Sequence, residues 1–124
     1  FEQDGESRFR EIESEVLKLT GSLTETIIST GGGTPCHGDN MDYMLSAGLT
    51  IYLKMTPEQL TKRLLDSSGE RPLIKNVPDD KLQTFIENML SAREKWYGRA
   101  NLIVDGVSID YTLLNNLVTG KFNH

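Results

Sequence analysis

The sequence has 124 residues, enough for one domain with a hydrophobic core and too few for two ordinary domains. Its formal net charge of −5 argues against a protein that binds nucleic acid, because phosphate backbones require clustered positive charge. The longest apolar stretches fall far short of the ~20 residues that span a bilayer, so we expect no membrane partner. The single cysteine, Cys36, cannot form an internal disulfide, and this favours a cytoplasmic protein.

The first predicted elements lead to a run of three glycines. A helix is expected from Gly5 to about Leu19, with one apolar, core-facing stripe at helical spacing: Phe9, Ile12, Val16 and Leu19. The segment Thr26–Thr30 is predicted to be a short buried strand that runs directly into Gly31-Gly32-Gly33. Glycine has no Cβ, so such a loop permits positive φ and lets backbone N–H groups come close to a ligand. The pattern therefore indicates a binding loop.

The next elements are a helix, a strand and a second helix. The helix is predicted over Asp39–Ala47 and is closed by Gly48. A strand is expected over Leu49–Met55. Thr56 is then the expected N-cap of a helix that has proline at its first position and ends near Asp66.

The second half of the chain continues the alternation of helices and strands. Ser67 to about Asp79 is polar and rich in turn formers, so we interpret it as a mobile loop. The remaining elements are a long helix, a strand and a last helix, predicted over Asp80–Tyr97, Leu102–Val104 and Ser108–Val118. Strands that alternate with helices predict an α/β fold with a parallel sheet covered on both faces and with ligands at the carboxyl ends of its strands.

Arginines on three separate elements could converge on an anion. Arg10 lies near the start of the first helix, Arg71 in the polar loop, and Arg93 late in the long helix. A guanidinium is always charged and binds carboxylate or phosphate through a planar fork. A solvated surface position is the better interpretation for Arg63 and Arg99. For Arg8 the two interpretations are about even.

The combined motifs resemble the shikimate kinase family, and the resemblance covers nearly the whole chain. The residues that carry it are Gly5-Glu6, Phe9-Arg10, Glu13, Ser29-Thr30-Gly31-Gly32-Gly33, Arg71-Pro72-Leu73-Ile74, Arg93 and Tyr97. The resemblance implies a P-loop kinase-like, three-layer α/β/α fold with a parallel sheet. It also implies transfer of the γ-phosphoryl group of ATP to the 3-hydroxyl of shikimate, in the pathway to chorismate and aromatic amino acids.

The resemblance also implies roles for individual residues. Arg10 and Arg93 are expected to clamp the shikimate carboxylate, while Gly31-Gly32-Gly33 contacts the ring hydroxyls. Arg71 is expected to be a catalytic, nucleotide-binding lid residue that covers the ATP phosphates. No residue is expected to bind Mg²⁺ directly, but Ser29 could reach it through a water. The alternative for Ser29 is a hydroxyl bonded to nearby backbone.

Two motifs of the family are missing from the sequence. It contains no phosphate loop of the form G-x-x-x-x-G-K-[ST] and no Asp-x-Asp segment. We therefore interpret residues 1–124 as a partial shikimate kinase domain that lacks its N-terminal strands, with a lid at about 67–79. The chain alone is expected to be inactive, poorly stable and able to self-associate through exposed sheet edges. Two alternatives remain open: another small-molecule kinase such as gluconate kinase, or a non-catalytic shikimate-binding or regulatory module.

Overall fold

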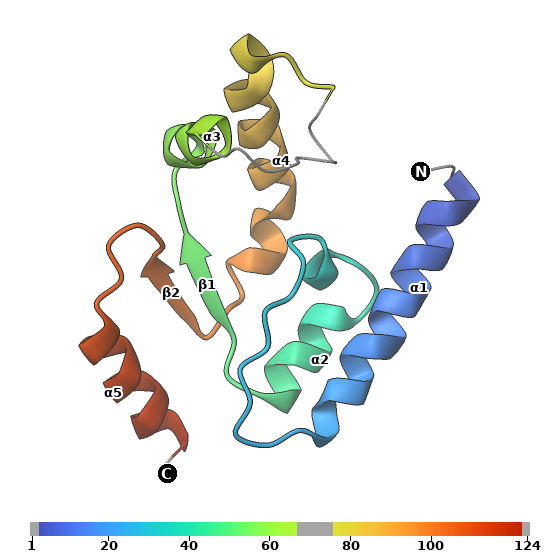
Figure 1. The fold of residues 1–124 in the computed structure, drawn as a ribbon. Coiled ribbons are helices and arrows are strands. Elements are labelled where there is room, and N and C mark those ends of the chain that lie inside the picture. Colours follow the sequence, from blue (N-terminus) through green and yellow to red (C-terminus); the bar gives the residue numbers. More distant parts are fainter. Residues whose placement is uncertain (1–2, 67–75, 123–124) are drawn as a thin grey trace.

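The computed structural model describes residues 3–66 and 76–122, which form helices around a short parallel sheet (Figure 1). The elements in chain order are α1 (Gln3–Leu19), η1 (Thr20–Ser22), η2 (Thr34–Cys36), α2 (Asn40–Ala47), β1 (Ile51–Lys54), α3 (Pro57–Asp66), η3 (Asp79–Lys81), α4 (Leu82–Tyr97), β2 (Leu102–Asp105) and α5 (Tyr111–Phe122). The predicted α/β class is confirmed.

The sheet is parallel, as predicted, and a polar contact fixes its register. β1 pairs with β2 so that Ile51 lies opposite Leu102. One residue earlier in each strand, the side-chain oxygen Oδ1 of Asn101 accepts hydrogen bonds from the backbone N–H (2.9 Å) and the hydroxyl (3.0 Å) of Thr50. The backbone N–H of Asn101 donates in return to Thr50 Oγ1 at 3.0 Å. The chain crosses from β1 to β2 through α3 and α4, the connection that parallel neighbours require.

The predicted cap at the start of α3 is confirmed. Thr56 Oγ1 accepts a hydrogen bond from the N–H of Gln59 at 3.1 Å, and Gln59 Oε1 accepts one from the N–H of Thr56 at 2.9 Å. This reciprocal pair is a capping box. α3 then lies against α4 (Figure 1), which contributes the two most deeply buried apolar side chains, Leu82 and Ile86. The crossover therefore has its own small core.

The predicted strand at Thr26–Thr30 is wrong. None of the described residues pairs with this segment, and its side chain Ile27 is 96% exposed. Glu25, just before it, has a φ of 51°, which turns the chain in the left-handed region. A strand is stable only where a neighbouring strand takes up its backbone hydrogen bonds, and an apolar pair such as Ile27-Ile28 does not supply that neighbour.

The predicted core-facing stripe of α1 is also wrong. Phe9, Ile12, Val16 and Leu19 are 43% to 74% exposed. The buried residue of this helix is Leu17, at 7% exposure, and it follows Arg10 and Glu13 at helical spacing. α1 contacts α2 and η2 through this more polar face, because its charged side chains have partners there.

Two further differences concern the sheet and the last helix. Leu53 and Ile103 remain 53% and 50% exposed, so the described helices do not fully cover the strands. The last helix starts at Tyr111 rather than at Ser108, because Asp110 caps it: Asp110 Oδ1 accepts a hydrogen bond from the N–H of Leu113 at 3.0 Å.

Candidate functional site

The three glycines form a tight turn that continues into η2. The N–H of Thr34 donates to the carbonyl of Gly31 at 3.2 Å, and the N–H of Cys36 donates to that of Gly33 at 3.0 Å. Gly33 has an ordinary helical φ of −86°. The positive φ that the glycine run would permit is therefore not used by this residue.

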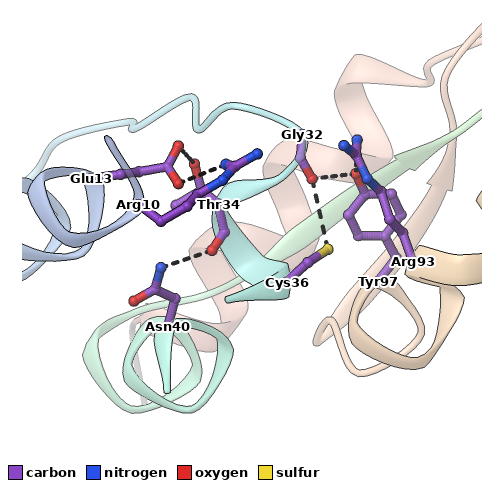
Figure 2. A network of polar contacts seen from close by, with 8 residues as sticks. All are labelled: Arg10, Glu13, Gly32, Thr34, Cys36, Asn40, Arg93 and Tyr97. Atoms are coloured by element: carbon purple, nitrogen blue, oxygen red, sulfur yellow. Dashed lines mark hydrogen bonds and ion pairs between the residues drawn. The ribbon is translucent and has the colours of Figure 1, made fainter. Parts of the chain in front are cut away.

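Space, rather than φ, accounts for Gly32 and Gly33. A Cβ at Gly33 would lie 2.8 Å from Nη1 of Arg10, and a Cβ at Gly32 would lie 2.9 Å from Nη1 of Arg93. Real Cβ atoms essentially never come this close to another heavy atom. Two guanidinium groups, one from α1 and one from α4, therefore lie against neighbouring glycines. Figure 2 shows Arg93 on the side of Gly32. The structure brings together four of the five residues that the sequence placed in one substrate site.

Glu13 links Arg10 to the glycine turn. Nη1 of Arg10 donates to Glu13 Oε1 at 2.9 Å, and Thr34 Oγ1 donates to Glu13 Oε2 at 2.8 Å. The Arg10 and Glu13 side chains are only 24% and 16% exposed. Because the carboxylate accepts from both groups, it fixes the guanidinium relative to η2.

Asn40, at the start of α2, anchors the same turn and was missed by sequence reasoning. Its side chain is fully buried, and Nδ2 donates to the carbonyl of Thr34 at 2.8 Å (Figure 2). An asparagine at the first position of a helix is ordinarily taken as a solvated or capping residue. Nothing in the local sequence indicates that it reaches back to Thr34.

The other half of the site is built on α4. Nη1 of Arg93 donates to the hydroxyl of Tyr97 at 3.3 Å, and this hydroxyl donates to the carbonyl of Gly32. The thiol of Cys36 donates to the same carbonyl at 3.9 Å. The ring of Tyr97 packs against that of Tyr52 on β1, with 5.0 Å between the centroids.

The charge of the site suits an anion. Arg10 and Arg93 face the turn with Glu13 as the carboxylate that pairs with Arg10. Burial raises the pKa of the Cys36 thiol, while the positive charges of Arg93, Arg10 and Lys95 act in the opposite direction. The turn therefore lies in the positive field of two guanidinium groups.

Of the other predicted residues, Gly31 lies in the turn, Ser29 precedes it, and Arg71 is outside the described residues. Gly31 is exposed, and a Cβ there would be 3.4 Å from Thr34 Oγ1. Ser29 is exposed in the extended segment before the turn. Arg71 and most of the expected lid lie outside the described residues.

The arginines interpreted as surface residues are exposed. Arg8 pairs with Glu11 at 2.9 Å, Arg99 pairs with Asp42, and Nη1 of Arg63 contacts the sulfur of Met55 at 3.6 Å. Arg8, left open by the sequence, is thus a surface residue that pairs along its own helix.

A groove lies along the sheet, apart from the glycine turn. It is an open groove of about 920 Å³ between the two strands and α4, and its lining includes Tyr52, Lys54, Leu90, Ile103 and Asp105. Within residues 3–66 and 76–122, no three His, Cys, Asp or Glu side chains are grouped to hold a metal ion. In the same ranges, no helix combines the length and the apolar character needed to cross a bilayer.

Comparison with known proteins identifies the family of this chain. The family model described as shikimate kinase matches residues 1–113. A shikimate kinase from Bacteroides fragilis is 41% identical over 103 residues, which are 83% of this chain and 58% of that protein. One from Parabacteroides distasonis is 40% identical over 105 residues, covering 85% of this chain and 61% of that protein.

A solved structure shows the same fold. The crystal structure of shikimate kinase from Bacteroides thetaiotaomicron superposes with a TM-score of 0.82 at 31% identity, covering 97% of this chain and 70% of that one. This confirms the predicted P-loop kinase-like α/β architecture. The chain spans 58% and 61% of the length of the two curated relatives. On the family match and this superposition, the chain belongs to the shikimate kinase family.

Proposed function

We propose that the protein transfers the γ-phosphoryl group of ATP to the 3-hydroxyl of shikimate, in the synthesis of chorismate and aromatic amino acids, and that this chain provides the shikimate side of the site. The observation that carries the proposal is the convergence of Arg10 and Arg93 on Gly33 and Gly32. The family match supports it.

Shikimate, the proposed acceptor of the phosphoryl group, would bind in two ways. Its carboxylate would accept charge-assisted hydrogen bonds from the two guanidinium groups, each worth roughly 1.5–3 kcal/mol. Its hydroxyl groups would meet the backbone of the glycine turn. The N–H groups of Gly32 and Gly33 make no hydrogen bond to another described residue, so they are available as donors.

ATP and Mg²⁺ belong to the proposed reaction through family membership alone. The sequence contains no phosphate-loop motif, and the described residues offer no metal-binding group. These residues therefore do not fit an ATP or Mg²⁺ site by themselves. Arg71, in the proposed lid at about 67–79, would cover the phosphates, and Ser29 would reach the ion through a water. A cytoplasmic location fits such a reaction.

The experiment measures shikimate-dependent ADP formation by the protein at its natural length, with the product identified by NMR. Arg10→Met and Arg93→Met should each raise the KM for shikimate roughly 10- to 100-fold, because each removes a charge-assisted bond to the carboxylate. Arg99→Met is the control, since Arg99 pairs with Asp42 on the surface. The 124-residue chain alone should form no ADP.

Other results would favour the alternatives. Gluconate-dependent ADP formation without a response to shikimate would identify another small-molecule kinase. Shikimate binding without any ADP formation by the natural-length protein would indicate a binding or regulatory module. ADP formation by the 124-residue chain would contradict the expected inactivity.

A further inference from the structure

The hydroxyl of Tyr97 lies where the two halves of the candidate site meet. It donates to the carbonyl of Gly32 and accepts from Nη1 of Arg93 at 3.3 Å (Figure 2). A carbonyl accepts hydrogen bonds and a guanidinium donates them. A phenol does both, and can join backbone and guanidinium through one oxygen.

The ring behind this hydroxyl is held in place. Tyr97 is the last residue of α4, and its ring packs against that of Tyr52 on β1 at a centroid distance of 5.0 Å and an interplanar angle of 49°. Tilted aromatic pairs at this distance attract each other. The hydroxyl is therefore presented to Gly32 from a position that is fixed by both the sheet and the helix.

Both Arg93 and Tyr97 lie close against Gly32. A Cβ on this residue would lie 2.9 Å from Nη1 of Arg93 and 3.2 Å from the Tyr97 hydroxyl. Apart from Tyr97, the donor recorded for the Gly32 carbonyl within the described residues is the Cys36 thiol, at 3.9 Å. A thiol is a weak donor, so it would not fix the Gly32 carbonyl by itself.

We propose that Tyr97 is a positioning residue for the acceptor: its hydroxyl fixes Gly32 and Arg93 relative to each other, so that Arg93 meets the substrate carboxylate while the turn meets the ring hydroxyls. This inference rests on the proposed function of the same site. Tyr97 itself does not contact the reacting atoms.

Tyr97→Phe tests this directly, because it keeps the ring against Tyr52 and removes only the hydroxyl. In the natural-length protein, the KM for shikimate should rise about tenfold, the change that one hydrogen bond to a charged group is worth, while kcat and the KM for ATP stay within about twofold. Tyr43→Phe is the matched control. It also removes a hydroxyl that donates to a carbonyl, that of Lys18 at 3.0 Å, but this contact joins α2 to α1.

A neutral analogue of shikimate distinguishes a positioning role of Tyr97 from a general loss of structure at the site. The carboxamide of shikimate cannot form an ion pair with Arg93. Tyr97→Phe should therefore weaken binding of the acid about tenfold and binding of the amide much less. The preference for acid over amide should therefore shrink in this variant and stay unchanged in Tyr43→Phe. A purely structural loss would weaken binding of both compounds equally.

A third readout does not depend on activity. Because the Cys36 thiol bonds to the same Gly32 carbonyl, release of this carbonyl in Tyr97→Phe should speed alkylation of Cys36 at fixed pH, followed by peptide mass spectrometry. If wild type forms no ADP with shikimate, the proposed function fails, and the Cys36 rate alone decides the role of Tyr97. An unchanged rate, a shikimate KM within twofold of wild type, or equal losses for acid and amide would each overturn the inference.

Discussion

At the scale of single residues, Gly32 and Gly33 illustrate why a glycine run marks a site. Each lies under a guanidinium, and a methyl group at either position would come within 3 Å of an Arg93 or Arg10 nitrogen. The resemblance to shikimate kinases predicted that Arg10, Arg93 and the glycines belong to one site, and the structure places Arg10 and Arg93 against Gly33 and Gly32. The sequence could not predict that space rather than φ sets the requirement, because that depends on which side chains arrive there.

Cys36 gives a prediction at this scale. Burial raises the pKa of its thiol, and the thiolate is the reactive form. Alkylation of Cys36 should therefore be slower than that of a free cysteine at neutral pH, and its rate should reach half-maximum above the ordinary thiol value. Among the positive charges that lower this pKa, Arg93 has the largest effect. Arg93→Met should therefore move the midpoint to a still higher pH. The measurement is the pH dependence of the alkylation rate, with Arg99→Met as control; a midpoint at or below that of a free cysteine would refute it.

Residues that join distant parts of the chain were out of reach of the sequence. Asn40 bonds to Thr34, and Thr34 bonds to Glu13 from 21 positions away. No periodicity or motif connects such positions. The link exists only once α1, η2 and α2 are packed together.

At the scale of elements, helices with local signals were predicted well and α3 is the best example. Its capping box predicts that Thr56→Ala lowers the free energy of unfolding by about 1 kcal/mol, because the N–H of Gln59 loses its acceptor. Urea denaturation measures the effect. Thr26→Ala serves as control, since that hydroxyl bonds only to the carbonyl of Thr24 in an exposed segment, and should change stability by less than about 0.5 kcal/mol. Equal losses in both variants would rule the cap out as the cause.

Elements whose stability depends on neighbours were predicted poorly. Thr26–Thr30 has the composition of a strand, but the described structure gives it no pairing partner. The face of α1 that turns inward carries Arg10 and Glu13 rather than the apolar stripe. Hydrophobic spacing identifies a helix, whereas the partners available to its charged groups decide which face is buried.

At the scale of the whole molecule, exposed apolar side chains bear on association. Leu53 and Ile103 on the strands are 53% and 50% exposed, and an isolated two-stranded pair is marginally stable. We therefore expect the 124-residue chain to self-associate through its sheet, with a molar mass that rises with concentration in light scattering after size exclusion. Leu53→Lys should shift the association equilibrium toward the monomer, because a lysine on a strand edge disfavours pairing with another chain. Ser46→Lys on exposed α2 is the control. A monomer at all concentrations would contradict this expectation.

The contact between Thr50 and Asn101 has a consequence for how the chain can vary in length. These residues are 51 positions apart, and their hydrogen bonds join the positions just before β1 and β2 directly. The entropy of closing such a loop grows only with the logarithm of its length, about 0.6 kcal/mol for each doubling. Insertions or deletions of a few residues between α3 and η3 would therefore change the cost of bringing the strands together by a small fraction of that amount. The crossover can vary in length while the sheet keeps its alignment.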